Sequence, residues 1–464
     1  MIRQPGIPAR RVPSSFRDPA GFVFERAGVL YRQVNHAGVK DYEHLMRSGL
    51  YSHLVDRGLL IAHREVDVTA AQPALACKVL MPDLVPFVSY PYEWSFSQLK
   101  AAALVTLQVQ EAALEFGMTL KDASAFNIQF REGQAVLIDT LSFQEYQGRP
   151  WDGYQQFCQH FLGPLLLAAK IDPRLVRLLR IHIDGIPLDL VSRLVPFHKT
   201  ALPVWVHIHV HSRIQRRAAV HVRPPSGKAA TIGPQRAILI VDSLRRAVES
   251  LDWKPTSSDW LGYYSDAAYT EKAFHAKRQI VAEWTDKVQP GCVWDLGSNI
   301  GLFSRITAGK GALTVAIDSD IAAVEENYRE VQRSCERLIL PLWMDLTNPS
   351  PALGWSNRER ASLLDRGPAD LTLALALLHH LVIRHNISPG LVAEFLASTA
   401  RYVIIEFVPK RDPQVQRMLH SRCDIFSDYN RRAFEQAFEQ YFAIVESREL
   451  PDSERSLYLM ERLS

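Results

Sequence analysis

Residues 293–301 read Val-Trp-Asp-Leu-Gly-Ser-Asn-Ile-Gly, and this stretch decides the fold of the C-terminal half. The apolar run from Val293 to Leu296 predicts a buried β-strand, and a helix is expected to begin near Leu302. Gly297 and Gly301 lie in the turn between them, where the missing Cβ lets the backbone approach a ligand. The N-terminus of the following helix offers free N–H groups and a positive dipole end, which suit a carboxylate or a phosphate. We therefore predict a ligand-binding turn here.

Dinucleotide-binding folds also use a glycine-rich turn, but their fingerprint needs glycine at the first, third and sixth places. Counted from Gly297, the third and sixth places hold Asn299 and Leu302, so the fingerprint is absent. Asp295, two residues before the first glycine, instead makes the stretch resemble motif I of the class I S-adenosylmethionine-dependent methyltransferases. The resemblance implies that Asp295, Gly297, Asn299 and Gly301 bind this cofactor.

Further predicted strands follow in the order of that family. Leu313–Ile317 is an apolar run that ends at Asp318, 23 residues after the acidic residue of the motif. A carboxylate at the end of this strand can accept hydrogen bonds from both ribose hydroxyls. Leu338–Trp343 predicts a third strand. The resemblance implies that Asp345 after it meets the adenine amino group, while neighbouring backbone at Leu346 reads the ring.

Four more runs complete the predicted sheet. They are Leu371–Leu375, Tyr402–Phe407, Phe442–Glu446 and Ser456–Met460, and the last two are expected to form a closing antiparallel pair. Helical stretches alternate with the strands, which indicates a doubly wound parallel sheet. The sequence therefore predicts an α/β fold for residues 256–464, a seven-stranded Rossmann-like methyltransferase domain.

The end of the fourth predicted strand bears on the methyl acceptor. Methyltransferases that act on amino groups of nucleic-acid bases commonly carry Asn/Asp-Pro-Pro-aromatic there, whereas residues 375–381 read Leu-Ala-Leu-Leu-His-His-Leu. This ending is similar to that of many small-molecule methyltransferases. His379 and His380 are candidate general bases, because imidazole titrates near neutral pH; packing against the following helix is the alternative. Glu406, at the end of the fifth strand, is a further candidate base or acceptor-binding group.

Composition indicates an ordinary multi-domain globular protein. The chain has 464 residues, of which 47% are hydrophobic and 22% charged. A net charge of +3 is too small to indicate nucleic-acid binding by itself. The five cysteines are scattered without a C-x-x-C pair, which favours reduced thiols over a disulfide frame or a zinc site. No secretory signal or membrane span is evident, so we expect a cytoplasmic protein without a bound metal in the C-terminal domain.

A second pattern lies in the N-terminal half. Asp122 is followed five residues later by Asn127 and, after a predicted strand pair, by Asp139. This order resembles protein kinases and aminoglycoside-type phosphotransferases, in which an Asp orients the attacking hydroxyl while an Asn and a second Asp hold magnesium. The resemblance implies an α+β kinase-like domain over residues 1–212, with Mg-ATP as its ligand.

Departures from that pattern leave the activity of this domain open. Leu120-Lys121 stands where His-Arg or His-Gly is usual, and Thr140-Leu141 replaces the glycine after the second Asp. No G-x-G-x-x-G loop occurs upstream, and the nearest equivalent of the lysine-bearing strand is Val29–Val34, with Arg32 in the lysine's place. The alternatives are a degenerate scaffold, nucleotide binding without transfer, and a working phosphotransferase.

Residues 213–255 are expected to connect the two halves. Ahead of them, Trp205–His211 alternates apolar residues with His207, His209 and His211, which predicts a strand with one polar face; a metal-binding row is the alternative. Six basic residues without an acidic one then occur among prolines and glycines, which is typical of a solvated linker. Ala237–Leu251 is expected to resume as a strand and a short helix.

Residues 404–412 and 424–429, with the segments around Asp122 and Asp139, extend the resemblance to a bacterial group of nodulation-protein-type methyltransferases. This group implies a two-part protein with a C-terminal methyltransferase, but it does not specify the acceptor. We therefore expect an enzyme that methylates oxygen or nitrogen of a small-molecule or metabolite acceptor, without a membrane or nucleic-acid partner and in an undetermined oligomeric state. The alternatives are a bifunctional protein whose N-terminal domain binds ATP or transfers phosphate, and a non-catalytic cofactor-binding regulatory protein.

Overall fold

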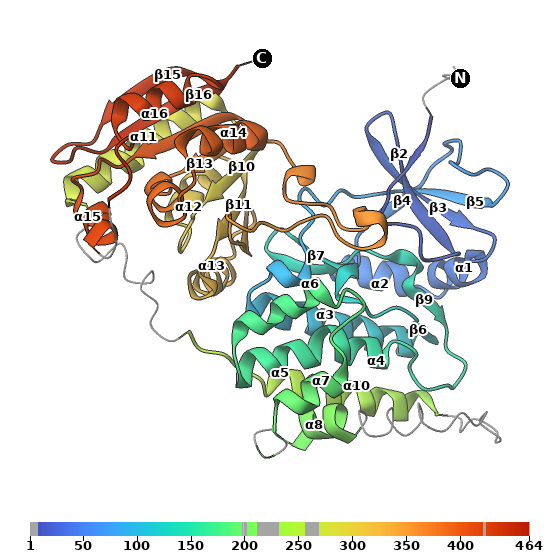
Figure 1. Cartoon of the computed structure of the whole chain (residues 1–464). Helices are drawn as coiled ribbons and strands as arrows, with labels where there is room; N and C mark the ends of the chain where they lie inside the picture. Colours follow the sequence, from blue (N-terminus) through green and yellow to red (C-terminus); the bar gives the residue numbers. More distant parts are fainter. Residues whose placement is uncertain are drawn as a thin grey trace. The chain divides into compact units, whose positions relative to one another are not determined.

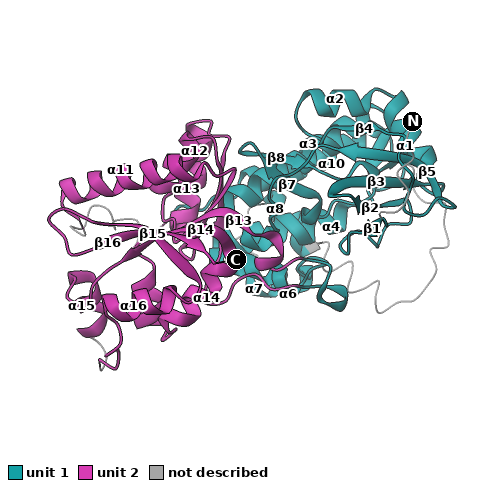
Figure 2. Ribbon diagram, turned by 90° about the horizontal axis from the view of Figure 1, so that it is seen from above, with its two compact units in different colours: residues 1–254, 353–360 teal, residues 255–352, 361–464 magenta. Residues whose placement is uncertain are grey.

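The computed structural model describes residues 8–196, 198, 202–210, 232–255, 269–420 and 424–463. The chain divides into two compact units, which are coloured separately in Figure 2. Unit 1 comprises residues 1–254 and 353–360, and unit 2 comprises residues 255–352 and 361–464. A short segment, residues 353–360, therefore leaves the sequence of unit 2 and packs as part of unit 1.

Unit 2 is built on a seven-stranded sheet. Its strands are β10 (Cys292–Leu296), β11 (Leu313–Asp318), β12 (Ile339–Trp343), β13 (Ala369–Ala374), β14 (Ala400–Phe407), β15 (Phe442–Glu449) and β16 (Ser456–Arg462). They lie in the order β12-β11-β10-β13-β14-β16-β15. The first five are parallel, and β16 is antiparallel to both β14 and β15. Unit 2 thus has the mixed α/β architecture that the alternation of patterns predicts.

Helices connect the strands of unit 2. They are α11 (Glu271–Val288), α12 (Leu302–Gly309), α13 (Ile321–Arg333), α14 (Pro389–Thr399), α15 (Pro413–His420) and α16 (Arg431–Phe438), with the π-helical turn η10 (His380–Arg384). Parallel strands need crossover connections, so helices cover both faces of the sheet. Helices α11, α12 and α13 lie on one face, and α14 and α16 lie on the other (Figures 1 and 2).

The burial of the strands explains their sequence patterns. All five residues of β12 are buried, as are four of the five in β10, because helices cover a parallel strand on both sides. Strand β15 at the sheet edge alternates buried or half-buried residues with exposed ones over most of its length. The core between α11 and the sheet includes Trp284, Val293 and Leu371.

Unit 1 combines a small antiparallel sheet with a helical part. The sheet has the order β1-β2-β3-β5-β4, with strands β1 (Arg10–Arg11), β2 (Gly21–Arg26), β3 (Val29–Asn35), β4 (His63–Glu65) and β5 (Ala76–Pro82). Two antiparallel strand pairs follow in the chain: β6 (Met118–Leu120) pairs with β9 (Phe143–Glu145), and the hairpin of β7 (Ile128–Arg131) and β8 (Gln134–Leu137) lies between them in sequence. The helices are α1 (Val39–Arg47), α2 (Leu50–Asp56), α3 (Phe96–Glu115), α4 (Tyr154–Phe157), α5 (Gly163–Lys170), α6 (Leu178–Ile181), α7 (Leu188–Leu194), α8 (Leu202–Trp205) and α10 (Pro234–Glu249).

Helix α3 is the central element of the helical part. Ser95 and Gln98 form a reciprocal capping box, in which each side chain accepts a hydrogen bond from the other residue's backbone N–H. Buried residues occur all around the helix, since it packs against α2, α5, β6 and α10. The strand pair predicted between Asn127 and Asp139 matches β7 and β8.

The predicted strand at Trp205–His211 is wrong, because the chain there forms α8 and the π-helical turn η7 (Val206–Val210). Val204 and Ile208 are fully buried four residues apart, a spacing that suits a helix. A run of seven residues is compatible with the period of a strand and with that of a helix, so tertiary packing decided which of the two formed. The imidazole of His207 contacts the Tyr154 hydroxyl at 2.6 Å and the Ser243 hydroxyl at 2.9 Å. His211 and most of the basic linker lie outside the described residues.

The predicted strand and short helix at Ala237–Leu251 are likewise wrong, since one helix, α10, covers most of that stretch. It packs against α3, where Arg245 pairs with Glu111 and the Lys100 ammonium donates to the Leu251 carbonyl at 2.6 Å. Five of its residues are buried at helical spacing, so this apolar stretch is the buried face of a helix and not a strand.

The segment of residues 353–360 is held in unit 1 by two arginines. Arg17 donates two hydrogen bonds to the carboxylate of Glu359, at 2.7 and 2.9 Å, and Glu359 is only 2% exposed. The Arg360 guanidinium lies 4.1 Å from the centre of the Phe126 ring. Burial by itself would raise the pKa of Glu359, but its bonds with Arg17 and Trp355 outweigh this and lower it. Glu359 therefore depends on Arg17 for its charge balance.

Replacing Arg17 with Ala should destabilise unit 1 by about 1–2 kcal/mol, because it removes a bidentate partner from a buried carboxylate; the figure allows for the half-exposed position of Arg17. Urea unfolding of the variant measures this. Arg64→Ala is the matched control, since Arg64 is exposed and donates only to the Met81 sulfur, and it should stay within about 0.5 kcal/mol of the wild type. Equal effects of the two changes would contradict a stabilising role for the Glu359 pair.

Candidate functional site

The turn after β10 is tied to the end of β11. Gly297, Asn299 and Gly301 all have positive φ, at +78°, +50° and +77°. Two successive N–H groups, of Gly297 and Ser298, donate to the Ile317 carbonyl at 2.9 and 3.0 Å. The N–H of Asn299 donates to the Asp318 carboxylate at 2.7 Å. The left-handed turn therefore brings its backbone against the carboxyl ends of both strands.

A buried carboxylate, that of Asp295, and a half-buried one, that of Asp318, mark these strand ends. Asp295 accepts the Ser304 hydroxyl at 2.6 Å, and Asp318 accepts the N–H groups of Asn299 and Asp320 on separate oxygens. Burial raises the pKa of each to about 6, although these hydrogen bonds act in the opposite direction. The site thus holds two acidic groups that a bound ligand with donors or positive charge would stabilise in their ionised form.

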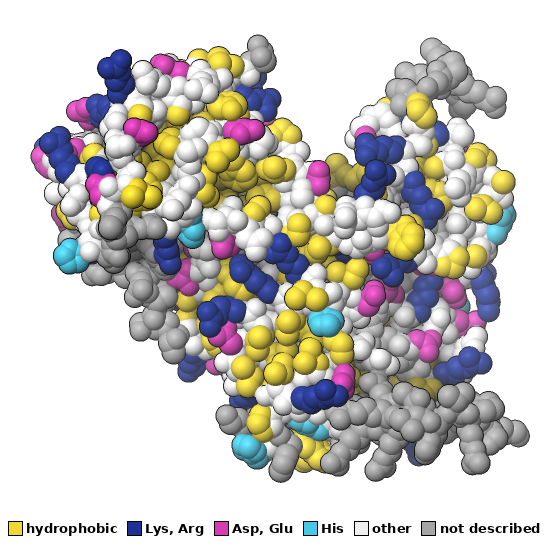
Figure 3. All heavy atoms as spheres, in the orientation of Figure 1, with side chains coloured by type: hydrophobic (Ala, Val, Ile, Leu, Met, Phe, Trp, Pro, Cys, Tyr) yellow, Lys and Arg dark blue, Asp and Glu magenta, His cyan; other side chains and the backbone are white. Residues whose placement is uncertain are grey.

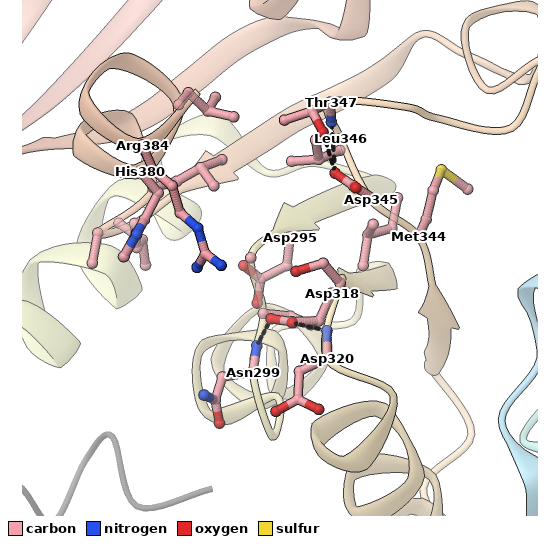
Figure 4. A pocket seen from close by; sticks show the side chains of 18 of the residues that line it. Asp295, Asn299, Asp318, Asp320, Met344, Asp345, Leu346, Thr347, His380 and Arg384 are labelled. Carbon is pink, nitrogen blue, oxygen red and sulfur yellow. Dashed lines mark hydrogen bonds between the residues drawn. The ribbon is translucent and has the colours of Figure 1, made fainter. Parts of the chain in front are cut away.

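A cavity of about 570 Å³ opens above these strand ends, a volume suited to a small-molecule ligand. Its lining comes from the ends of β10, β11, β12 and β13, from α11 and α12, and from η10. Figure 4 shows Asp295, Asp318 and Asp320 on one side, the Met344–Thr347 segment after β12, and His380 and Arg384 across from the carboxylates. The cavity therefore extends along the carboxyl edge of the sheet, where α/β folds bind ligands.

The structure brings most of the predicted site residues to this cavity. Those that line it are Asp295, Gly297, Asn299, Asp318, Asp345, Leu346 and His380. Gly301, His379 and Glu406 are not among the lining residues. Further lining residues, which sequence patterns did not single out, include Lys277, Phe303, Ser319, Asp320, Thr347, Arg384 and His385.

Gly301 serves the turn rather than the cavity surface. It is the N-cap of α12, and a Cβ on it would lie 2.6 Å from the Asn327 side chain and 2.7 Å from Arg305. Both the positive φ and this crowding require glycine, so the residue fixes where α12 begins. A displaced α12 would carry Ser304 away from Asp295.

Gly301→Ala should lower the free energy of unfolding of unit 2 by about 1–3 kcal/mol, because alanine is strained at this φ and meets Asn327. Gly309→Ala, at the other end of the same helix, is the matched control, since its Cβ would have nothing within 4 Å. It should be neutral or stabilising by up to about 1 kcal/mol. Denaturant titration of both variants measures the difference; a Gly301→Ala protein as stable as wild type would show that the turn tolerates a side chain.

The two candidate histidines have different environments. His380 lines the cavity, and burial, with the nearby charges of Arg384 and His385, lowers its pKa to about 4. His379 is fully buried, and neither of its ring nitrogens has a hydrogen-bond partner among the described residues. The two rings lie 4.2 Å apart. Of the pair, only His380 faces the space in which a ligand would bind.

Glu406 lies behind the cavity in a buried charge network. Its carboxylate accepts the Lys277 ammonium at 2.7 Å and the Tyr269 hydroxyl at 2.8 and 3.1 Å, and Arg455 lies 3.6 Å away. Arg455 in turn pairs with Asp412 at 2.7 Å. Burial would raise the pKa of Glu406, but Lys277 and Arg455 outweigh it and lower the pKa. Glu406 is therefore an ionised anchor for two buried cations.

Lys277 is one of the lining residues that sequence reasoning missed. It lies on α11 with Ala273, Ile280, Val281 and Trp284, all of which are buried. A lysine within such an apolar stripe was the available signal, because a buried lysine needs a partner. Its partner Glu406 is 129 residues away, so only the fold shows the pair.

Unit 1 brings together Asp122, Asn127 and Asp139, as their order in the sequence predicts. Asp122 accepts the Ser124 N–H at 3.0 Å, and burial together with the charge of Asp139 raises its pKa. Arg32 on β3 forms an ion pair with Asp139. Burial would raise the pKa of Asp139, but the charge of Arg32 and hydrogen bonds outweigh it and lower the pKa. The second Asp is thus already occupied by a cation of the protein.

The surface of the molecule is mixed in character. On the face drawn in Figure 3, Lys and Arg side chains are interspersed with acidic and apolar ones. No helix among the described residues has both the length and the apolar character needed to cross a membrane. Within the same described parts of the chain, no group of three or more His, Cys, Asp or Glu is arranged to hold a metal ion.

Comparison with known proteins identifies a full-length relative. No protein-family model matches the chain. The nodulation protein NoeA of Rhizobium meliloti (strain 1021) is 37% identical in an alignment of 475 positions. This alignment covers 97% of this chain and 96% of the relative. A likeness of this extent includes both units.

Solved structures match a smaller part. WbdD, described as a bifunctional kinase-methyltransferase, matches 43% of this chain with 20% identity and a TM-score of 0.29. This chain spans less than half of WbdD, about 41% of its length. Magnesium protoporphyrin IX methyltransferase (ChlM) from Synechocystis PCC 6803, solved with bound SAH, matches 44% of this chain and 92% of its own at 19% identity and a TM-score of 0.33. The N-methyltransferase NodS from Bradyrhizobium japonicum WM9 matches 42% of this chain and 98% of its own, at 12% identity and a TM-score of 0.31.

Proposed function

We propose that this chain, which belongs to the family of the nodulation protein NoeA, transfers a methyl group from S-adenosylmethionine to a small-molecule acceptor. The observation that carries the proposal is the Asp318 carboxylate, held at the end of β11 by the left-handed turn and exposed to a cavity along four neighbouring strand ends. This arrangement offers separate groups for the three parts of that cofactor. The proposed acceptor atom is an oxygen or a nitrogen.

The residues present fit S-adenosylmethionine. Each oxygen of Asp318 accepts one backbone N–H, and because a carboxylate has about four lone pairs, acceptor capacity remains for both ribose hydroxyls. Met344, Asp345 and Leu346 follow β12, the strand beside β11, and would hold the adenine ring and its amino group. Asp295 and the turn at Gly297 mark the end of β10 on the other side, where the amino-acid part would lie.

Charge supports the same assignment. Four carboxylates line the cavity, those of Asp295, Asp318, Asp320 and Asp345. S-adenosylmethionine bears a sulfonium and an ammonium against one carboxylate, so its net charge is positive. Acidic walls attract such a ligand and favour it over an anionic nucleotide.

Methyl transfer is a displacement at the sulfonium methyl that the cofactor supplies, so the protein's work is to position the acceptor and to take its proton where necessary. His380 is the candidate base, because its ring lines the cavity and its low pKa keeps it unprotonated at neutral pH. Glu406 is a positioning residue, since it acts through Lys277. The buried His379 packs behind His380 and has no access to the acceptor through the cavity lining.

Asp318→Ala should weaken binding of S-adenosylhomocysteine about 100-fold, because two hydrogen bonds to a charged group are lost, while the fold is retained. The wild-type affinity should also fall as pH drops below about 6, since the pKa of Asp318 is about 6 and the ionised form accepts the ribose hydroxyls. Calorimetric titration between pH 5 and 8 measures both effects.

Asp286→Ala is the control for this experiment, because Asp286 is an exposed residue of α11 paired with Lys310. It should leave the affinity unchanged at every pH. A folded Asp318→Ala protein with wild-type affinity would contradict the assignment of the ribose site. Binding without turnover of any acceptor would instead favour the alternative of a non-catalytic regulatory protein.

For unit 1 we propose a kinase-like scaffold rather than a phosphotransferase. The Arg32 guanidinium engages Asp139, the carboxylate that would hold magnesium in a kinase. Lys121 pairs at 3.3 Å with Asp18, in the segment between β1 and β2. Both ion pairs neutralise charged side chains that would otherwise be available to bind a metal nucleotide. Mg-ATP binding, with or without phosphate transfer, is the alternative.

Asp139→Asn is expected to leave the affinity for S-adenosylhomocysteine unchanged, because the scaffold carries no part of the cofactor site. The same calorimetric titration measures this, and a titration with Mg-ATP should give no heat in either wild type or variant. Magnesium-dependent ATP binding that disappears in Asp139→Asn would contradict the scaffold and support a bifunctional protein. The substitution preserves the shape of the side chain, which limits its effect on folding.

A further inference from the structure

Lys277 is a buried cation at the edge of the cavity. Its side chain is 2% exposed, and it lines the cavity from α11. Transferring an ammonium group out of water is costly, so such a lysine is retained only where partners compensate it. The surroundings of its Nζ therefore indicate what it does.

Two of the three ammonium protons of Lys277 are accounted for. Nζ donates to the Glu406 carboxylate at 2.7 Å and to the Tyr269 hydroxyl at 2.9 Å. Among the described residues no third acceptor is within hydrogen-bond distance of Nζ, whereas an ammonium carries three donors. A donor thus remains for a ligand in the cavity that Lys277 lines.

The network around Lys277 fixes its position. Glu406 is held in turn by Tyr269 and Arg455, and the rings of Tyr269 and Phe303 each lie 4.7 Å from Nζ. An ammonium held by a salt bridge and two aromatic faces loses little further freedom when it binds an anion. The arrangement is that of a preorganised anion-recognition group.

Lys277 lies at the amino-acid end of the proposed cofactor site. Phe303 beside it lies in the first turn of α12, which follows the β10 turn, while Glu406 is the penultimate residue of β14. Strands β10 and β14 lie on the side of β11 away from β12, and β12 is followed by the adenine-contacting segment. The cavity wall near Lys277 is therefore remote from the adenine end.

On these grounds we infer that Lys277 binds the carboxylate of the cofactor's amino-acid moiety and so sets the specificity of the site for a complete methionyl or homocysteinyl group. This inference rests on the proposed function. Lys277 would recognise a carboxylate in either of two ligands, the cofactor's amino-acid moiety or an acidic acceptor. Arg384, another basic residue that lines the cavity, is exposed on η10 and is the rival for this role.

The test compares two ligands that differ in one group: S-adenosylhomocysteine and its decarboxylated analogue, 5′-deoxy-5′-(3-aminopropylthio)adenosine. Wild type should bind the first about 10- to 100-fold more tightly, the range for one hydrogen bond between charged groups. In Lys277→Met this preference should vanish, through weaker binding of S-adenosylhomocysteine and unchanged binding of the analogue. Calorimetric titration provides all four affinities.

Two further variants separate recognition from folding. Lys277→Met leaves Glu406 without its main partner, so the double variant Lys277→Met/Glu406→Gln removes both charges and should show the same loss of preference. Lys272→Met changes a lysine of the same helix whose side chain is 70% exposed, and it should keep the wild-type preference. Thermal unfolding of each variant verifies that it is folded.

The outcomes distinguish the two levels of the proposal. If wild type binds neither ligand, the proposed function fails. If wild type binds both equally, or if Arg384→Met rather than Lys277→Met abolishes the preference, the cofactor site stands and the role of Lys277 is overturned. Equal weakening of both ligands in Lys277→Met would also overturn it, because a structural role does not discriminate by the carboxylate. An unchanged preference in Lys277→Met would also overturn the assignment, and it would indicate that Lys277 binds an acidic acceptor instead.

Discussion

The hydrogen bond from the Asn299 N–H to the Asp318 carboxylate, 2.7 Å long, joins the ends of two adjacent strands, and the site of unit 2 is organised around it. It can form only because Gly297, Asn299 and Gly301 turn the backbone through the left-handed region. The turn directs N–H groups toward β11 and starts α12 where Ser304 reaches Asp295. One local constraint thereby positions the carboxylates of Asp295 and Asp318 and the floor of the cavity.

Behind the cavity, unit 2 keeps four charged side chains out of water: Lys277, Glu406, Arg455 and Asp412. Two positive and two negative charges alternate, so each desolvated group has an opposite neighbour. Such a network contributes little net stability over an apolar core, but breaking one pair costs about 3–5 kcal/mol. It therefore fixes geometry more than it stabilises the fold, which is the property a ligand-positioning group requires.

Unit 1 uses the same kind of pairing to a different end. The Arg32–Asp139 and Lys121–Asp18 pairs satisfy charges around a kinase-like trio, and Arg17 holds Glu359 of a segment whose sequence belongs between β12 and β13. That segment is continuous in sequence with the loop after Asp345, so the chain passes from unit 2 into unit 1 and back between β12 and β13. The two units are thus not independent pieces of sequence joined by one linker.

The sequence by itself determined the α/β order of unit 2 and the residues at its strand ends. Apolar runs bounded by turn residues predict covered strands, and glycines close to an acidic residue mark the turn, so the sequence alone predicts Asp295, Asp318 and Asp345 at one edge of the sheet. The grouping of Asp122, Asn127 and Asp139 in unit 1 could also be predicted from a single short stretch of sequence. The strands predicted within residues 205–211 and 237–251 were wrong. These apolar runs are compatible with a strand and with a helix, and packing against neighbouring helices selected the helix. Only the tertiary structure decided that His380 faces the cavity while His379 and Glu406 do not, and that Lys277 meets Glu406. Such pairs join residues more than a hundred positions apart, and no local pattern encodes which buried charge neutralises which.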